Sequence, residues 1–367
     1  MADSVPMGTF APKIFPFSVA LHIEEHLAAE GAEKTSLVGT GGYTFPGDWL
    51  FLRAPAIPKT GHARAFLLPA PNTGIDFASP FALLCLCSGD SPKPMARIIA
   101  VANQKGGVGK TTTAINLAAS FAAAEVNTLL VDCDPQANAS SGLGFAKDPD
   151  RVSIYHLLMG AATADEALLQ TGLEQLWIIP SHKNLIGANI ELIDADDREF
   201  RLRKAIEPLR ERFHYIVLDC PPALDLLTLN ALVAADSVLI PMQGEYFALE
   251  GVSELLDTID RIREALNPSL AIEGVALAMF DERTNLAQQV RTELKNFFGD
   301  KLLTTTVPRN IRLAEAPSHG KAVLQYDPRS RGAESYIKLA KEIIERAGSQ
   351  AGESPEPQAQ QVPPLAS

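Results

Sequence analysis

The sequence predicts an α/β protein in which a mostly parallel, doubly wound sheet is covered by helices on both faces, giving three layers. Between Met95 and about residue 347, short apolar runs typical of strands alternate with longer runs typical of helices. Runs this apolar indicate strands buried on both faces, and therefore a parallel sheet with crossover helices. The predicted strands are Ile98–Ala102, Thr128–Val131, Leu176–Ile179, Tyr215–Leu218, Ser237–Ile240 and Gly274–Met279, and the predicted helices are Thr111–Ala124, Arg198–Phe213, Leu224–Ala234, Leu249–Leu266 and Leu286–Phe298.

The segment after the first predicted strand has the features of a phosphate-binding loop. It reads Asn-Gln-Lys-Gly-Gly-Val-Gly-Lys-Thr-Thr over residues 103–112, and a helical pattern follows directly. Glycines in such a loop let main-chain N–H groups converge on an anion at a helix N-terminus. Lys110 can then reach the outer phosphates, and the Thr111 hydroxyl can hold Mg²⁺. Ligands of parallel sheets bind beyond the carboxyl ends of the strands, which is where this loop falls.

This loop departs from the general nucleotide pattern G-x-x-x-x-G-K-[ST], because Gln104 stands where the first glycine belongs. Its form, K-G-G-x-G-K-T-T, resembles the deviant Walker A loop of the ParA/MinD group of ATPases, and Lys105 matches the additional lysine of that group. We therefore expect the P-loop NTPase fold in its deviant Walker A form.

Acidic residues follow two further predicted strands. Asp132 and Asp134 stand in the string Asp-Cys-Asp-Pro after the second strand, and residues two apart at a strand end point to the same side. One carboxylate can engage the water shell of a metal ion, and the other can position a water that attacks the outer phosphate. Asp219 ends another apolar strand, a position that usually supports Mg²⁺ in phosphate-loop NTPases. We expect Thr111, Asp132 and Asp219 at the metal.

Several strings in a fixed order resemble the chromosomal ParA/Soj branch of this group. The likeness runs from Met95 to about Arg346 and touches neither end of the chain. The strings are Asp219–Pro222, Leu229–Leu232, Asp281–Asn285, Pro308–Lys321 and Tyr326–Ala333.

The resemblance implies a role for each matching residue. Lys105 matches the lysine that reaches across a two-fold dimer to the partner's ATP, and Asp134 matches the acid whose loss blocks hydrolysis. With Lys110, these are the candidate catalytic residues. The implied nucleotide-binding residues are Lys105, Gly106, Gly107, Val108, Gly109, Lys110, Thr111 and Thr112, with Pro308, Arg309 and Asn310 near the adenine.

Two arginines, Arg283 and Arg312, match residues that bind DNA phosphates in the family. The chain carries a net charge of −12, but residues 281–346 hold twelve Lys and Arg against nine Asp and Glu. A modest basic face in this region is compatible with phosphate contacts, which ignore base sequence and weaken steeply with salt. Ordinary solvated helix faces explain the same charge count equally well.

The resemblance implies an ATP- and Mg²⁺-dependent ATPase of chromosome or plasmid partitioning. An ATP-bound sandwich homodimer would bind double-stranded DNA non-specifically, and hydrolysis stimulated by a ParB-like centromere-binding protein would release it. We expect a cytoplasmic, nucleoid-associated protein without membrane contact, because no run of 18 apolar residues occurs and no export signal begins the chain.

Three alternatives share the predicted fold. A MinD-like membrane-positioning ATPase would need a basic amphipathic helix at its C-terminus, whereas this chain ends in an acidic, proline-rich segment. An ATP-dependent amide-forming ligase would lack the strings around Arg283 and Arg312. An iron–sulfur reductase would need cluster cysteines at the dimer seam, whereas Cys133 and Cys220 fall within the predicted nucleotide loops.

The two ends of the chain differ from the body. Residues 1–94 hold 11 of the 26 prolines and show no sustained periodicity, which predicts a poorly structured N-terminal extension. Because Met95 directly precedes the first strand, we hypothesise that it is the true start and that residues 1–94 belong to a mis-called reading frame. The rival hypothesis is an accessory domain. Residues 95–347 form the predicted ATPase domain, and residues 348–367 the predicted disordered Pro/Gln-rich tail.

Overall fold

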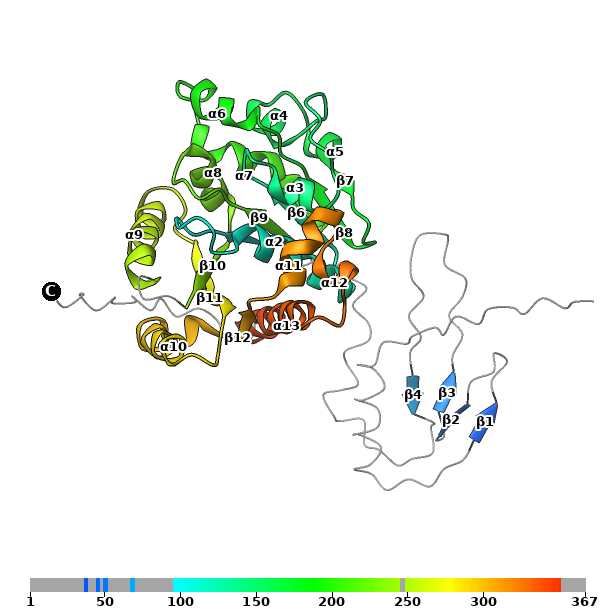
Figure 1. Ribbon diagram of the computed structural model, residues 1–367. Helices are drawn as coiled ribbons and strands as arrows, with labels where there is room; N and C mark the ends of the chain where they lie inside the picture. Colours follow the sequence, from blue (N-terminus) through cyan, green and yellow to red (C-terminus); the bar gives the residue numbers. More distant parts are fainter. Residues whose placement is uncertain are drawn as a thin grey trace, which may run out of the picture. The chain divides into compact units, whose positions relative to one another are not determined.

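The computed structural model describes residues 36–38, 44–46, 49–51, 67–69, 95–244 and 248–350 (Figure 1). It divides the chain into two units, residues 1–89 and 90–367. In the first unit, two short antiparallel pairs are described. They are β1 (Ser36–Val38) with β2 (Thr44–Pro46), and β3 (Trp49–Phe51) with β4 (Leu67–Pro69). Most of the predicted extension, and the predicted tail beyond Gln350, lie outside the described residues.

The second unit is built on an eight-stranded sheet with the order β12-β11-β10-β5-β9-β6-β8-β7 (Figure 1). Its ladders are parallel except for the edge pair of β7 and β8. The strands are β5 (Arg97–Val101), β6 (Thr128–Asp132), β7 (Leu169–Gln170), β8 (Leu176–Ile179), β9 (Tyr215–Asp219), β10 (Ser237–Gln243), β11 (Ala271–Phe280) and β12 (Leu302–Pro308).

The first strand of this unit, β5, lies inside the sheet between β9 and β10. From β5 the chain winds outward through β6 and β8 and returns to β9, and it then continues through β10, β11 and β12 on the other side of β5. The direction of winding therefore reverses beside β5. Such a reversal opens a crevice at the carboxyl ends of the strands, where ligands of open α/β sheets bind.

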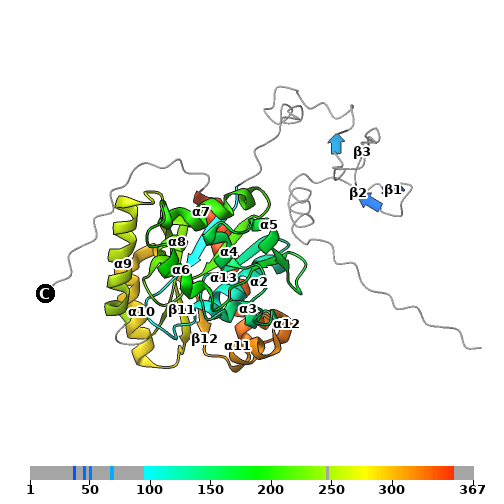
Figure 2. The same ribbon diagram turned by 90° about the horizontal axis from the view of Figure 1, so that it is seen from above.

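Side chains of successive strand residues enter two separate cores, one on each face of the sheet. Ile98 and Ala100 belong to one core, and Ile99 and Val101 belong to the other. Helices cover both cores, which confirms the three-layer arrangement (Figures 1 and 2). Those whose buried residues line the first core are α4 (Ile154–Met159), α6 (Leu185–Glu191), α7 (Arg201–Ile206), α8 (Leu226–Ala234), α9 (Ala248–Ala265) and α10 (Asn285–Phe298). Those that line the second are α2 (Lys110–Ala123), α3 (Asn138–Gly142), α11 (Ile311–Glu315), α12 (Val323–Tyr326) and α13 (Arg331–Gln350).

The sequence prediction differs from the structure in one helix and in the elements that it missed. The predicted helix Arg198–Phe213 is broken into two 3₁₀ turns around α7, because Pro208 stands at the start of the second turn and cannot continue the α-helical hydrogen bonds. Strand β12 and the 20-residue helix α13 were not predicted as elements. Strand β7 and the short helices α3, α4, α5 (Ala164–Ala167), α6, α11 and α12 were also not predicted. Among the described residues, no helix is both long and apolar enough to cross a membrane.

The amino ends of the central strands are joined by paired charges. Glu273, near the start of β11, is buried. It forms a 2.7 Å ion pair with Arg97 of β5 and accepts a 2.5 Å hydrogen bond from Ser237 of β10. Beside them, Asp236 accepts a hydrogen bond from the Ile98 N–H at 2.8 Å and forms an ion pair with Arg210 at 2.9 Å. These contacts fix the mutual register of three neighbouring strands.

Candidate functional site

The predicted phosphate loop forms an open cradle between the carboxyl end of β5 and the first turn of α2. Gly107 and Gly109 have φ angles of 76° and 91°, which glycine adopts without the strain that a side chain would meet. A Cβ at Gly106 or Gly107 would meet no atom within 4 Å, so the surface of the cradle is free of protein. No side chain caps α2. The first N–H groups of this helix are therefore available to an anion.

Residues outside the loop motif hold the cradle in place. Asn103 donates to the Pro241 carbonyl at 2.8 Å and accepts the Lys105 N–H at 3.0 Å, so it joins the loop to β10. Gln243, at the end of β10, donates to the Gly107 carbonyl at 3.0 Å. Sequence reasoning assigned neither residue a role. The position of Gln243 at the end of an apolar strand was the signal from which its contact with the loop could have been predicted.

The two lysines of the loop occupy different environments. Lys110 is buried, and its ammonium donates to the Lys105 carbonyl at 3.1 Å, so it points back across the cradle. Burial lowers the pKa of Lys110, while the negative charge of Asp219 acts in the opposite direction. Lys105 is exposed at the rim. The structure thus separates a buried lysine inside the loop from an exposed one at its rim.

Asp132 is fully buried and already well bonded. It accepts from the Ser140 hydroxyl at 2.6 Å, from the Ser140 N–H at 2.8 Å and from the Asp134 N–H at 3.2 Å. Desolvation nevertheless raises its pKa to about 6, against these hydrogen bonds. The bonds tie β6 to α3 and hold the loop that carries Asp134. Asp132 is therefore built to orient its neighbours, and Ser140 is a partner that the sequence did not reveal.

Asp134 lies in the turn after β6. One of its carboxylate oxygens accepts the Gln136 N–H at 2.9 Å, and its side chain is buried at the edge of the cradle. Ala137, three residues on, has a φ of 54°, a conformation that costs energy for a residue with a side chain. The turn is thus held in a strained form, and this form keeps Asp134 beside Asp132.

Asp219 is the least satisfied polar group of the site. It pairs in register with Asp132 on β6 and with Val101 on β5, which places it directly under the cradle. Both of its carboxylate oxygens are buried without a hydrogen bond. Burial and the charge of Asp132 raise the pKa of Asp219 well above its ordinary value, while Thr111 and Lys110 act in the opposite direction. A buried carboxylate with this little compensation indicates a missing cationic partner.

These residues fit a magnesium ion bound together with a phosphate. Mg²⁺ usually takes one or two carboxylates and completes its shell with phosphate oxygens and water. The described residues contain no cluster of three or more His, Cys, Asp or Glu that could hold a metal alone, which agrees with a site completed by its ligand. Thr111, at the start of α2, and Asp219 would supply a hydroxyl and a carboxylate to such an ion, next to Asp132.

The predicted adenine segment lies three strands away from β5, at the carboxyl end of β12. Pro308 ends β12, Arg309 is exposed, and the Asn310 side chain caps α11 by accepting the Arg312 N–H at 2.8 Å. Asn116 of α2 accepts the Val323 N–H at 2.8 Å and donates to the Thr112 carbonyl at 2.8 Å. The helix that begins at the cradle is therefore connected directly to α12, which follows this segment.

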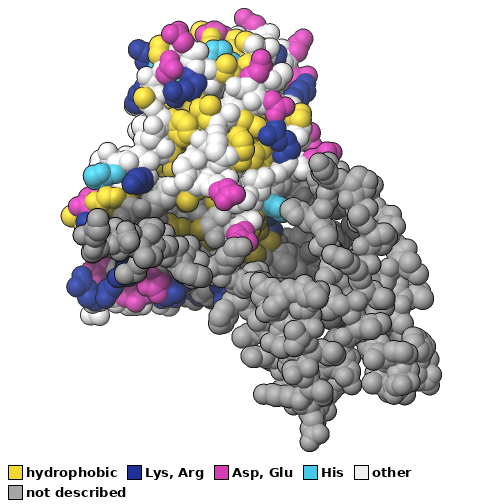
Figure 3. Space-filling model, turned by 90° about the vertical axis from the view of Figure 1, so that its right-hand side faces the viewer, with side chains coloured by type: hydrophobic (Ala, Val, Ile, Leu, Met, Phe, Trp, Pro, Cys, Tyr) yellow, Lys and Arg dark blue, Asp and Glu magenta, His cyan; other side chains and the backbone are white. Residues whose placement is uncertain are grey.

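The two predicted DNA-binding arginines lie after neighbouring strands on this edge. Arg283 follows β11 and pairs with Asp281 at 2.7 Å, and its side chain is 88% exposed. Arg312 of α11 pairs with Glu315 at 2.7 Å and with Asp327 at 3.3 Å. Exposed ion pairs of this kind are weak, so a phosphate group can compete for either guanidinium. On the face shown in Figure 3, positive and negative side chains are interspersed.

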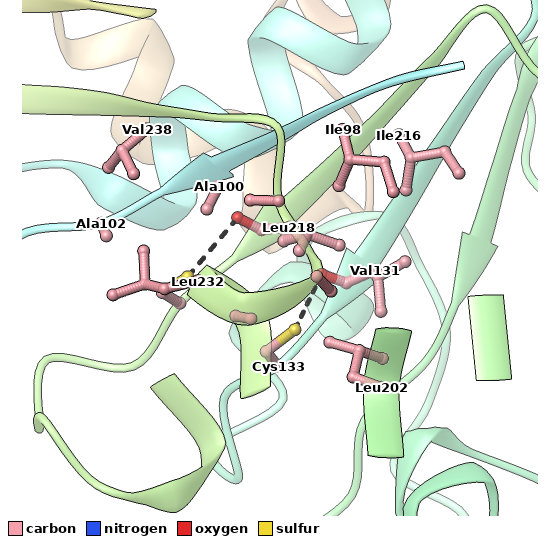
Figure 4. Packing of buried hydrophobic residues seen from close by; sticks show 14 of the residues in the cluster. Ile98, Ala100, Ala102, Val131, Cys133, Leu202, Ile216, Leu218, Leu232 and Val238 are labelled. Carbon is pink, nitrogen blue, oxygen red and sulfur yellow. Dashed lines mark hydrogen bonds between the residues drawn. The ribbon is translucent and has the colours of Figure 1, made fainter. Parts of the chain in front are cut away.

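The two cysteines next to the acidic residues face the core. The Cys133 thiol donates to the Val131 carbonyl at 3.8 Å, and the Cys220 thiol to the Leu218 carbonyl at 3.9 Å (Figure 4). Both thiols are buried, and burial raises the pKa of each. They are therefore packing residues with little thiolate character, although their main chain belongs to the nucleotide loops.

A glycine cradle at the winding reversal of a parallel sheet, with a buried lysine and a buried carboxylate whose oxygens accept no hydrogen bond, defines a P-loop nucleoside triphosphatase of the deviant Walker A class. Comparisons with known proteins agree. A family model described as an AAA domain matches residues 96–272. The chromosome partitioning protein ParA of Myxococcus xanthus is 54% identical over 252 residues, which are 69% of this chain and 89% of that protein. The sporulation initiation inhibitor protein Soj of Bacillus subtilis is 53% identical over 249 residues, which are 68% and 98%.

Solved structures give the same fold. Cobyrinic acid a,c-diamide synthase from Mycobacterium smegmatis, with bound ADP and magnesium, is 33% identical with a TM-score of 0.62, covering 70% of this chain and 97% of that one. The cell division ATPase MinD of Pyrococcus furiosus is 26% identical with a TM-score of 0.58, covering 69% and 100%. The identity to the partitioning proteins extends over nearly their full length. The chain belongs to the ParA/Soj family of chromosome-partitioning ATPases.

Proposed function

We propose that this protein binds ATP with Mg²⁺ in the cradle and uses its hydrolysis to control attachment to DNA. The observation that carries the proposal is the buried Asp219, whose two oxygens are without hydrogen bonds directly under a glycine cradle that contains Lys110. Bound Mg²⁺ would neutralise charge on the phosphates. The main-chain N–H groups of the cradle bind the phosphates, Lys110 stabilises the outer ones, and Thr111 and Asp219 hold the metal.

The protein's own residues would divide the chemistry between them. Asp134, held in its turn by the Gln136 N–H, orients the attacking water. Lys105 is exposed at the rim of the cradle, so it can serve the triphosphate of a second copy. A cation supplied in this way stabilises charge on the transferred phosphoryl group. The active unit is accordingly a homodimer that forms on ATP.

The dimer would bind double-stranded DNA through Arg283 and Arg312, without sequence preference. Both arginines lie on the edge that carries the nucleotide site, and their ion pairs are exposed. A ParB-like centromere-binding protein would stimulate hydrolysis, open the dimer and release the DNA. The protein would then act in the cytoplasm, on the nucleoid, and its cargo would be a chromosome or plasmid.

DNA binding measured at several salt concentrations tests this proposal. With ATP and Mg²⁺ we expect binding to duplexes of arbitrary sequence, and with ADP we expect little. Arg283→Glu should weaken binding for all DNA sequences. It should also lower the slope of the logarithm of the binding constant against the logarithm of the salt concentration, by roughly one for each phosphate that is no longer neutralised. Arg203→Glu, the same charge change at an exposed site on α7, is the matched control. DNA binding that depends neither on the bound nucleotide nor on Arg283 would refute the proposed control of DNA attachment by ATP.

The shared triphosphate site has its own test. Lys105→Ala should bind ATP as a monomer, fail to dimerise and lose nearly all hydrolysis, as followed by light scattering and phosphate release. A Lys105→Ala protein that dimerises and hydrolyses ATP at the normal rate would contradict the proposed exchange of lysines. Asp134→Ala should instead retain ATP and stay dimeric, because this substitution removes only the group that orients water.

A further inference from the structure

Helix α2, which begins at the phosphate loop, carries polar side chains on one of its buried sides. Thr113, Asn116 and Ser120 are each at most 5% exposed, and their spacing of three and four residues places them on the same side of the helix. Ser120 donates to the Asn116 carbonyl at 2.7 Å and so stays within the helix. Thr113 and Asn116 instead bond to residues 223 and 207 positions later in the sequence. Buried polar groups cost free energy unless they are bonded, so these two contacts indicate what the start of α2 must hold.

Both ends of the Asn116 amide are bonded. Its nitrogen donates to the Thr112 carbonyl at 2.8 Å, and its oxygen accepts the N–H of Val323, the first residue of α12, at 2.8 Å. Thr112 ends the phosphate loop, so a single buried side chain connects this loop to α12. The hydroxyls of Thr113 and Tyr336 share a hydrogen bond of 3.2 Å, and Tyr336, in α13, is 1% exposed. Two later helices are therefore fixed to the end of α2 that faces the phosphate-binding cradle.

The segment that contains Arg312 also rests on the helix after the catalytic turn. We name residues 311–326, which comprise α11, α12 and the 3₁₀ turn between them, the arginine segment. Gly320 of this segment and Gly144, just beyond α3, have φ angles of 64° and 88°, and a Cβ at Gly320 would lie 2.7 Å from the Gly144 Cα. The two main chains therefore touch. Figures 1 and 2 show the arginine segment beside α2 and α3, the two helices that leave the nucleotide site.

Helix α13 makes a further contact with the arginine segment. Gly332, in the first turn of α13, lies so close to α11 that a Cβ there would be 2.8 Å from Leu313. Arg312 itself pairs with Asp327, between α12 and α13, at 3.3 Å. The hydrogen bonds that leave the start of α2 therefore end on α12 and α13, and these helices border the residues that hold Arg312.

We propose that Asn116 and Tyr336 are positioning residues, through which occupancy of the cradle sets the placement of the arginine segment. Phosphate groups that bind the first N–H groups of α2 order this turn. The Thr112 carbonyl is ordered with it, so Asn116 transmits the constraint to α12, while Thr113 and Tyr336 transmit it to α13. Binding that restricts one site in this way lowers the free energy of the restricted form at the other site. The inference rests only on nucleotide binding in the proposed function, and it needs neither a second copy nor DNA.

Hydrogen exchange of the full-length protein, with and without Mg²⁺ and ADP, tests the inference. ADP fills the cradle without requiring the dimer that is proposed to form on ATP. Asn116→Ala removes both bonds of the amide, and the matched control Asn127→Ala removes a 2.6 Å hydrogen bond to the Arg212 carbonyl beyond the far end of α2. The exchange of residues 103–112 reports nucleotide binding, and that of residues 320–326 reports the arginine segment.

In the wild type and in Asn127→Ala, we expect ADP to slow the exchange of residues 320–326 at least about fivefold, the lower end of typical couplings between sites. In Asn116→Ala, residues 103–112 should be protected as in the wild type, whereas ADP should change the exchange of residues 320–326 less than about twofold.

The outcomes separate this inference from the proposed function. If Asn116 only stabilises the fold, Asn116→Ala will speed the exchange of residues 320–326 but leave the factor due to ADP unchanged, and this result would overturn the inference alone. A wild type whose residues 103–112 do not respond to ADP would refute nucleotide binding in the cradle, and with it both proposals.

Tyr336→Phe covers the case in which Asn116→Ala does not fold. This variant loses only the hydroxyl that bonds Thr113 and keeps the buried ring, so we expect it to fold and to bind ADP. The protection that ADP gives to its residues 320–326 should be at least about twofold smaller than in the wild type. Equal protection in Tyr336→Phe and the wild type would contradict the proposal.

Discussion

At the amino edge of the sheet the buried carboxylate Glu273 has two close partners, whereas at the carboxyl edge Lys110 and Thr111 offset the burial of the carboxylate Asp219 only in part. Glu273 accepts from Arg97 and Ser237, and the three groups join neighbouring strands. Asp219 lies beside a second buried acid, Asp132, and both of its oxygens are without hydrogen bonds. The same kind of group, at opposite ends of the same sheet, is therefore compensated at one edge and only partly compensated at the other.

The difference separates charges that stabilise the fold from charges that prepare for a ligand. A buried ion pair with all its hydrogen bonds holds its elements together, and removal of one partner is costly. A buried charge without a partner lowers stability until a ligand arrives, and the free energy of binding then offsets that cost.

Lys110→Ala should have the largest effect of any single change at the carboxyl edge. Lys110 is the buried cation of the cradle, and loss of one preorganised charge that stabilises a transition state reduces turnover by about 100-fold or more. Phosphate release at saturating ATP measures this loss. Lys338→Ala, which removes an exposed lysine of α13, is the matched control and should leave turnover unchanged. Normal turnover in Lys110→Ala would mean that the cradle does not bind phosphates.

Glu273→Ala should have the largest effect on stability at the amino edge. It leaves Arg97, which is one quarter exposed, without its buried partner, and we expect a loss of about 2–3 kcal/mol in the free energy of unfolding. Urea denaturation measures this loss, and hydrolysis at a permissive temperature should be unchanged. Glu334→Ala, which breaks an exposed ion pair with Lys338, should give no measurable change. An inactive but stable Glu273→Ala protein would contradict the division between the two edges.

Asp219→Asn should act in the opposite direction in the absence of ligand. It removes an uncompensated buried charge at nearly constant volume, so the ligand-free protein should gain about 1 kcal/mol. The variant should then lose most of the stabilisation that Mg²⁺ and ATP confer on the wild type. Thermal denaturation with and without the ligands measures both effects. Asp236→Asn, an acid that is paired at the amino edge, should lower stability under both conditions.

The sequence predicted the parts of this arrangement that depend on local pattern. All six predicted strands are present, because buried parallel strands read as apolar runs. The loop over residues 103–112 was recognised because glycines, lysines and threonines stand at fixed spacing. The three acidic residues were recognised because each stands at the end of an apolar strand or just beyond it. Neither Glu273 nor Ser237 shows such a pattern, so the amino-edge cluster was not predicted.

What the sequence could not show depends on contacts between distant segments. Asn103 and Gln243 support the cradle across a separation of about 140 residues, and Asn116 contacts Val323 across an even longer one. Strand β12 was missed because three consecutive threonines, Thr304–Thr306, obscure the apolar pattern of an edge strand. The different burial of Lys105 and Lys110 also required the folded loop, because both lie in the same short motif.

The smallest expected effect is the pH dependence of the gain from Asp219→Asn. Burial raises the pKa of Asp219 in the folded protein above its value in the unfolded chain, which is about 3.9. Below pH ~4 the residue is protonated in both states, so it carries no penalty and the variant should match the wild type. As the pH rises, the unfolded chain releases its proton first, and the wild type therefore loses stability relative to the variant. Unfolding of both ligand-free proteins at pH 4 and pH 8 measures the difference. An equal gain at both values would show that shape or hydrogen bonding, and not the buried charge, distinguishes the carboxyl edge.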